Sequence, residues 1–175
     1  MNDHIRDDSP RNTQKGNPAH SYPEALSAWP GAVTLLTIAD GRDDIGTTVS
    51  AFCPVSTDPP LVLVSLIADS YPAEVLTRRD AFAVTVLAAS QRVLAGRFAA
   101  AGRPGARLLL DGIEHRRGDA SGALIPDGGL TAFECAVASR VPAGDHVLLI
   151  GAVLRIPYLA ESGAPLIRFR GSYLR

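Results

Sequence analysis

The chain has 175 residues, of which 46% are hydrophobic, and its formal net charge is −1 at pH 7. This length and composition predict a single globular domain with one sizeable core. The near-neutral charge and the lack of a basic stripe with interleaved aromatics argue against a nucleic-acid partner. The sequence shows neither a secretory signal nor an apolar run of the roughly 20 residues that a membrane span requires, so we expect a cytoplasmic protein without membrane contact.

The cysteines and histidines do not form a metal-binding pattern. Cys53 and Cys135 are far apart, and the four histidines do not stand at ligand spacing with acidic residues. We therefore expect two reduced thiols in or near the core, no disulfide framework and no bound metal.

Residues 1–20 are polar and contain almost no large apolar side chain. Such a segment cannot bury enough surface to offset its ordering entropy, so it is predicted to be a disordered tail, with residues 21–175 forming the domain. Apolar patterns predict strands over residues 33–38 and 45–50, joined by a polar turn at 40–44. Continuous Leu and β-branched content predicts a buried strand over residues 61–67.

A short helix is predicted over residues 73–79, with Pro72 tolerated in its first turn, and a strand over residues 81–87. Ser90 is predicted to cap a second helix that reaches about Ala101. Val93, Leu94, Arg97, Phe98 and Ala101 fall on one face of it. Helix statistics alone favour a packed Phe98 and an Arg97 that extends toward solvent.

The remainder of the chain predicts further β structure. Residues 102–129 are loop-rich with a short strand near Ile113, and residues 133–141 and 146–156 form a long hairpin around a turn at 142–145. A last short strand is expected over residues 166–170. Antiparallel strands with two brief helices favour a β-barrel or sandwich with helical additions. Rossmann, phosphate-loop and nucleophile-elbow motifs are absent from the sequence, and no Ser, His and Asp set is evident.

Residues 46–56 carry small and hydroxyl side chains between two apolar strands. Glycine and small residues let a ligand approach the backbone, and free amides and hydroxyls can bind a phosphate or a flavin ring edge. The segment is therefore a candidate site for a flat, phosphorylated ligand. An ordinary Ser/Thr-rich strand and turn is the alternative.

Several short motifs follow one another in a specific order. They lie at residues 29–34, 46–52, 55–62, 82–87, 91, 94–98, 134–135, 144–146, 150–153 and 169–173, and include Gly144-Asp145-His146 and Phe169-Arg170-Gly171-Ser172-Tyr173. In this order, from about Trp29 to Tyr173, the chain resembles the flavin reductase-like family of the FMN-binding split barrel. These are the reductase components of two-component flavin-dependent monooxygenases.

The resemblance implies a mainly β fold, an antiparallel Greek-key split barrel in one domain, which forms a homodimer with a flavin groove near the subunit interface. It implies an NAD(P)H:flavin oxidoreductase that transfers hydride from NADH or NADPH to FMN or FAD. A partner flavin-dependent monooxygenase component would receive the reduced flavin. Hydride transfer requires close stacking of the two rings, so no catalytic acid, base or nucleophile is expected.

The resemblance also assigns site residues. The flavin-binding set is Gly46, Thr47, Thr48, Ser50, Ala51, Ser65, Leu66, Ile67, Ser70, Arg97 and Phe98, with Arg97 near the phosphate. The nicotinamide-nucleotide set is His146, Arg168, Phe169, Arg170 and Gly171. Without the resemblance, His146 would be interpreted as a turn-edge histidine that is satisfied by its neighbours.

The chain departs from the family pattern at two places. Cys53 and Pro54 stand where Ser or Thr is usual, and Tyr71-Pro72 replaces a basic residue beside Ser or Thr. Pro72 cannot donate a hydrogen bond and Tyr71 has no positive charge, so a weaker phosphate grip is expected there. Ser70 could compensate, or could simply cap the following helix.

Three alternatives stay open. The protein could retain a tightly bound flavin and reduce another substrate, could bind or carry flavin without reductase activity, or could be a barrel with a degenerate pocket. The choices between FMN and FAD, and between NADH and NADPH, also stay open.

Overall fold

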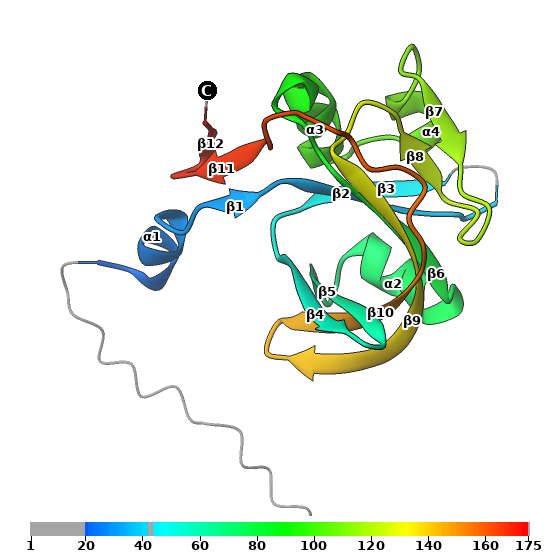
Figure 1. The fold of residues 1–175 in the computed structure, drawn as a ribbon. Coiled ribbons are helices and arrows are strands. Elements are labelled where there is room, and N and C mark those ends of the chain that lie inside the picture. Colours follow the sequence, from blue (N-terminus) through cyan, green and yellow to red (C-terminus); the bar gives the residue numbers. More distant parts are fainter. Residues whose placement is uncertain (1–19, 42–43, 175) are drawn as a thin grey trace, which may run out of the picture.

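The computed structural model describes residues 20–41 and 44–174. Nearly all of the predicted tail, residues 1–19, lies outside the described residues. The main feature is a seven-stranded sheet in which every neighbouring pair is antiparallel, in the order β3-β2-β6-β9-β10-β5-β4 (Figure 1). Its strands are β2 (Thr34–Ile38), β3 (Ile45–Val49), β4 (Phe52–Thr57), β5 (Pro60–Ile67), β6 (Ala81–Val86), β9 (Thr131–Ala143) and β10 (His146–Arg155).

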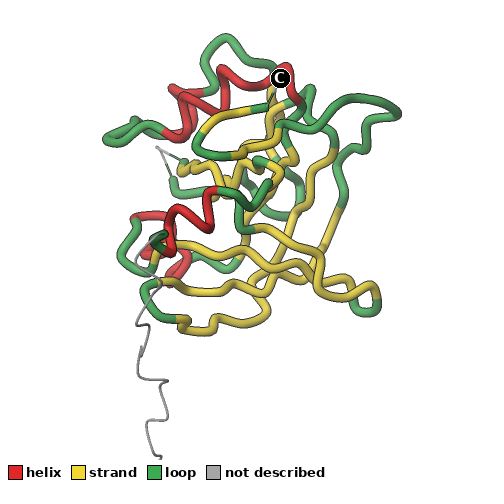
Figure 2. The backbone as a smooth tube through the Cα atoms, turned by 90° about the vertical axis from the view of Figure 1, so that its left-hand side faces the viewer, coloured by secondary structure: helices red, strands yellow, loops and turns green. Residues whose placement is uncertain are grey.

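Two small sheets and several short helices surround this sheet. The strands of the small sheets are β1 (Gly31–Ala32), β11 (Ile167–Phe169) and β12 (Ser172–Tyr173), and β7 (His115–Arg117) with β8 (Leu124–Pro126). The helices are α1 (Tyr22–Ser27), α2 (Tyr71–Arg78), α3 (Arg92–Ala99), α4 (Ala106–Leu109) and the 3-10 turn η1 (Ala89–Gln91). Strands form the body of the molecule, while the helical segments lie along one side and the top in Figure 2.

The topology explains why the large sheet curls. Its two edge strands, β3 and β4, are consecutive in the chain and are linked only by Ser50 and Ala51. A chain that leaves one edge of a sheet and enters the other within two residues requires the two edges to come together. The amide of Ser65 donates to the carbonyl of Ala51 at 3.0 Å, which extends the β4–β5 ladder into this corner.

Two apolar clusters fill the space on either side of β2 and β3. Inside the curl, Leu36, Val64 and Phe82 pack with Val75 and Leu76 of α2, and all five are almost fully buried. The second cluster joins Leu35 to α3, α4 and the C-terminal segment through residues such as Phe98, Leu110 and Leu166. The corner at residues 50–51 is therefore held by a packed core on both faces of the strand that precedes it.

The mainly β, antiparallel architecture predicted from the sequence is observed, with its strands close to the predicted bounds. The predicted cap at Ser90 is wrong. Ser90 lies within η1, and α3 begins at Arg92. The side chain of Gln91 stabilises η1, because it accepts from the amide of Ala88 at 3.1 Å and donates to the carbonyl of Asp127 at 2.9 Å.

Three further differences concern short elements. The loop-rich stretch over residues 102–129 contains α4 and the β7–β8 hairpin, and the strand expected near Ile113 begins at His115. β4 was not predicted as a strand, and it tolerates Pro54 because it is an edge strand. Cys135 is buried, which raises the pKa of its thiol to about 12, whereas Cys53 is exposed on β4 and lies outside the core.

Candidate functional site

A groove of about 360 Å³ lies where the chain turns from β3 into β4. The end of β3, the corner at 50–51, the end of β5 and the start of α2 line it, together with two residues from more distant elements. Its lining residues are Thr47, Thr48, Val49, Ser50, Ala51, Ser65, Leu66, Ile67, Ser70, Pro72, Arg103 and His146. Eight of the eleven residues predicted to bind flavin thus line one groove.

Strand register determines which side chains meet in the groove. The hydroxyl of Thr34 donates to the carbonyl of Val49 at 2.8 Å and ties the end of β3 to β2. Ser50 and Ala51 are left exposed at the corner. In the β5–β10 ladder His146 is the direct partner of Ile67, so the antiparallel register places the imidazole beside the end of β5.

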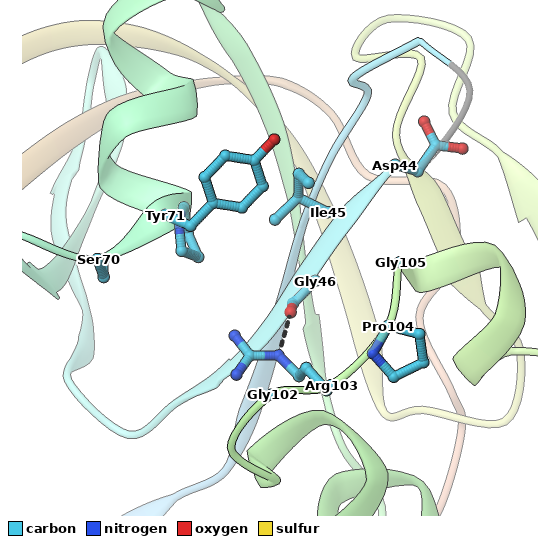
Figure 3. A pocket seen from close by; sticks show the side chains of 10 residues that line it. Asp44, Ile45, Gly46, Ser70, Tyr71, Gly102, Arg103, Pro104 and Gly105 are labelled. Atoms are coloured by element: carbon cyan, nitrogen blue, oxygen red, sulfur yellow. Dashed lines mark hydrogen bonds between the residues drawn. The ribbon is translucent and has the colours of Figure 1, made fainter.

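Two further hollows adjoin the groove. The first, of about 450 Å³, shares Ser70, Pro72 and Arg103 with it and extends past Gly46 and Tyr71 to residues 102–105 (Figure 3). The second, of about 410 Å³, shares Ser50 and Ala51 with the groove. We call these the Arg103 hollow and the Trp29 hollow, after a residue that lines each one.

The predicted nicotinamide residues separate into two places. Arg168, Phe169, Arg170 and Gly171 line the Trp29 hollow together. His146 lies in the groove itself, where its Nδ1 is 2.7 Å from the carboxylate of Asp145. The neighbouring imidazole lowers the pKa of Asp145 from its usual value.

Arg97 and Phe98 line neither the groove nor the Arg103 hollow. Phe98 is fully buried in the second apolar cluster, and a Cβ added at Gly46 would overlap its ring. Gly46 therefore serves close packing with α3, and it also lines the Arg103 hollow. The guanidinium of Arg97 donates to the carbonyls of Leu109 at 3.1 Å and Asp111 at 3.4 Å, so it fixes the end of α4.

Sequence reasoning missed Arg103, which lines both the groove and the adjoining hollow. Its Nε donates to the carbonyl of Gly46 at 2.8 Å and its Nη1 to the carbonyl of Ala100 at 3.3 Å. Partial burial lowers the pKa of this guanidinium, although an arginine keeps its charge. The only available signal was a cation within Gly102-Arg103-Pro104-Gly105, a loop whose position no periodicity predicts.

The start of α2 forms the wall opposite Arg103. Ser70 is the N-cap, and its hydroxyl accepts from the amide of Ala73 at 3.4 Å. The capping role considered for Ser70 is therefore observed, and the same residue lines the groove and the Arg103 hollow.

A buried carboxylate anchors the loop that carries Arg103. Asp44 is about 1% exposed and accepts from Arg107 Nε and Arg117 Nη2, each at 2.8 Å, while its carbonyl accepts from the amide of Ala106 at 2.9 Å. Burial raises the pKa of this carboxyl, but the hydrogen bonds from Arg117 and Arg107 outweigh burial and hold the pKa below its ordinary value of 3.8.

Two observations apply to the part of the chain that the structure describes. No helix there is long and apolar enough to cross a membrane. Within the same residues, no three His, Cys, Asp or Glu side chains gather in an arrangement that could hold a metal ion.

Comparisons with known proteins agree with this geometry. The sequence profile of the flavin reductase like domain matches residues 26–175. The NADH-dependent FMN reductase AsuE2 of Streptomyces nodosus subsp. asukaensis is 36% identical over 170 residues, which are 95% of this chain and 88% of that protein. The FMN reductase (NADH) SmoA of Agrobacterium fabrum is 36% identical over 160 residues, 91% of this chain and 87% of that protein.

Solved structures share the fold. BorF, the flavin reductase component of a bacterial two-component tryptophan halogenase, superposes with a TM-score of 0.81 at 31% identity, covering 87% of this chain and 94% of BorF. The NADH:FAD oxidoreductase SgcE6 of Streptomyces globisporus, solved with NAD and FAD fragments, gives a TM-score of 0.80 at 29% identity over 87% of this chain and 89% of SgcE6. The predicted split-barrel fold class is confirmed, and the chain belongs to the flavin reductase-like domain family.

Proposed function

We propose that the protein is an NADH-dependent flavin reductase that delivers reduced flavin to a separate oxygenase or halogenase component. The observation that carries this proposal is the groove, which eight residues of the predicted flavin set line together with His146. Of the relatives described above, AsuE2 and SmoA use NADH and FMN, SgcE6 is an NADH:FAD oxidoreductase, and BorF is the flavin reductase component of a tryptophan halogenase.

The residues of the groove fit a flavin. Thr47, Thr48, Ser50 and Ser65 offer hydroxyl and backbone groups for the polar edge of the ring and the ribityl chain, while Ala51 leaves room for close approach. The bound flavin supplies the hydride acceptor. The chain contributes binding, orientation and exclusion of water.

The Trp29 hollow is proposed to hold part of the nicotinamide nucleotide. It adjoins the groove through Ser50 and Ala51 and carries two cations, Arg168 and Arg170, which suit phosphate oxygens. Trp29 is 78% exposed there and offers an aromatic face for stacking. His146 is proposed to contact the nicotinamide end, because it lies in the groove beside Ile67.

A homodimer is also proposed. α1 buries none of its own residues, and Tyr22 and Leu26 expose large apolar surfaces on this helix. Such a patch is typical of an interface between protein chains. Sedimentation of the purified protein measures this directly, and a monomer at micromolar concentration would contradict the proposal.

The loss of nicotinamide absorbance tests the activity. Purified protein is mixed with NADH or NADPH, with FMN, FAD or no added flavin. We expect oxidation of NADH that depends on added flavin. Oxidation without added flavin by a protein that remains yellow after gel filtration would favour a tightly held cofactor and another substrate. Flavin binding in a titration without any oxidation would favour a carrier and contradict the proposal.

A further inference from the structure

We propose that Arg103 binds the phosphoryl group at the end of the flavin ribityl chain, the role that the resemblance implied for Arg97. This inference rests on the proposed function. It assigns the phosphate contact to a residue of the loop between α3 and α4, and it makes FMN and FAD better ligands than riboflavin.

The position of Arg103 is the first argument. It lines the groove that holds Thr47 to Ala51 and also the hollow beyond Ser70, so it stands at the boundary between the two spaces. Among the described residues that line these two spaces, it is the only lysine or arginine. Figure 3 shows its guanidinium reaching from the loop, beside Gly46, toward the side on which Ser70 lies.

The bonding of the guanidinium is the second argument. Nε and Nη1 are held by the carbonyls of Gly46 and Ala100, and the described part of the chain provides no carboxylate partner for Arg103. A partly buried cation without a counter-ion is unfavourable, whereas an oxyanion would offset that cost through charge-assisted hydrogen bonds. Two fixed nitrogens orient the planar group in advance, so little entropy is lost when a ligand binds.

The opposite wall supplies the third argument. Pro72 has no amide hydrogen, and the amides of Ala73 and Glu74 already donate to the hydroxyl and carbonyl of Ser70. The start of α2 therefore has few free donors for a phosphate. The cation that the family places at Tyr71-Pro72 is missing, and Arg103 faces the same space from the other side.

Arg97 cannot serve instead, because its guanidinium bonds the carbonyls of Leu109 and Asp111 and lines neither space. The two arginines thus provide a matched pair of variants. Arg103→Met and Arg97→Met remove the same charge and keep similar side-chain length, one inside the groove and one outside it.

Binding of FMN, FAD and riboflavin, measured by quenching of flavin fluorescence, tests the proposal. We expect the unmodified protein to bind FMN about tenfold more tightly than riboflavin, as one charge-assisted contact allows. Arg103→Met should abolish most of this preference and leave riboflavin affinity unchanged. Arg103→Lys should keep part of the preference, and Arg97→Met should keep all of it.

Riboflavin affinity doubles as the folding control, because a collapsed groove would lose riboflavin as well as FMN. The proposal is overturned if Arg103→Met retains the full FMN preference, or if Arg97→Met loses it. It is also overturned if Arg103→Met raises the KM for NADH while the preference for FMN over riboflavin persists. Arg103 would then bind a phosphate of the nicotinamide nucleotide and not the phosphate of the flavin. An unmodified protein that binds none of the three flavins would instead reject the proposed function itself.

Discussion

Asp44 and Glu134 are both about 1% exposed, yet they are bonded in different ways. Among the described residues, Glu134 Oε1 has no hydrogen-bond partner and lies 3.9 Å from Arg155 Nε. Asp44 is held by two arginines from α4 and β7, and by the amide of Asp40 at 3.3 Å. Glu134 Oε2 accepts from the amides of Ala120 and Ser121 and from the Ser121 hydroxyl, at 2.7 to 2.9 Å. Asp44 thus joins distant segments through ion pairs, whereas Glu134 bonds the backbone amides of one short loop.

The difference matters because only Asp44 lies at the binding region. It lines the Arg103 hollow and anchors Ala106 and Arg107, three and four residues after Arg103. The loop organised by Glu134 lines neither the groove nor the two hollows beside it. A loss at Asp44 should therefore affect both stability and flavin binding, whereas a loss at Glu134 should affect stability alone.

Glu134→Ala should have the largest effect on stability. It leaves two amides and a hydroxyl without their buried acceptor and opens a cavity, so we expect a loss of about 3 to 4 kcal/mol in the free energy of unfolding. Urea unfolding measures this value. Affinity for FMN, measured at low temperature where the variant is folded, should be unchanged. Glu114→Ala, at an exposed position, is the control. A fall in FMN affinity would remove the contrast between the two carboxylates.

Asp44→Asn should cost less stability, about 2 kcal/mol, because Arg107 and Arg117 are roughly half exposed and can be solvated when the carboxylate charge is lost. It should also loosen the Arg103 loop and weaken FMN binding about threefold to tenfold, with a smaller change for riboflavin. Titrations with both flavins measure this. Asp119→Asn breaks an exposed ion pair with Arg155 and should change neither the free energy of unfolding nor the affinity for FMN. Equal losses for FMN and riboflavin would contradict a role through Arg103.

The smallest expected effect is a pH dependence. The pKa of Asp44 is lowered on folding, so its contribution to stability is fully present above its ordinary value of 3.8 and is lost as the pH falls through the folded-state pKa. The stability gap between the unmodified protein and Asp44→Asn should therefore narrow in acid. Urea unfolding of both proteins at neutral and acidic pH measures the gap. A gap that stays constant down to about pH 3 would show that the charge of Asp44 contributes nothing.

The groove wall was predictable, whereas its charged end was not. Residues 46–49 and 65–67 belong to strands, and the family motifs predicted that they and the corner at 50–51 line one groove. Periodicity placed Arg97 at the boundary between helix and core, but its partners, Leu109 and Asp111, lie in a segment that the pattern classed as loop. Arg103 lies in that same segment, and Arg117 lies on a strand of three exposed residues. Their positions depend on tertiary contacts that local sequence does not encode.

The three adjoining spaces have a consequence for redesign. Ser50 and Ala51 are shared by the groove and the Trp29 hollow, while Ser70, Pro72 and Arg103 are shared by the groove and the Arg103 hollow. Substitutions at shared residues would alter two ligand environments together. Residues that line only an outer space, such as Tyr71 at one end and Phe169 at the other, are thus the positions at which selectivity for one ligand can be engineered independently of the other.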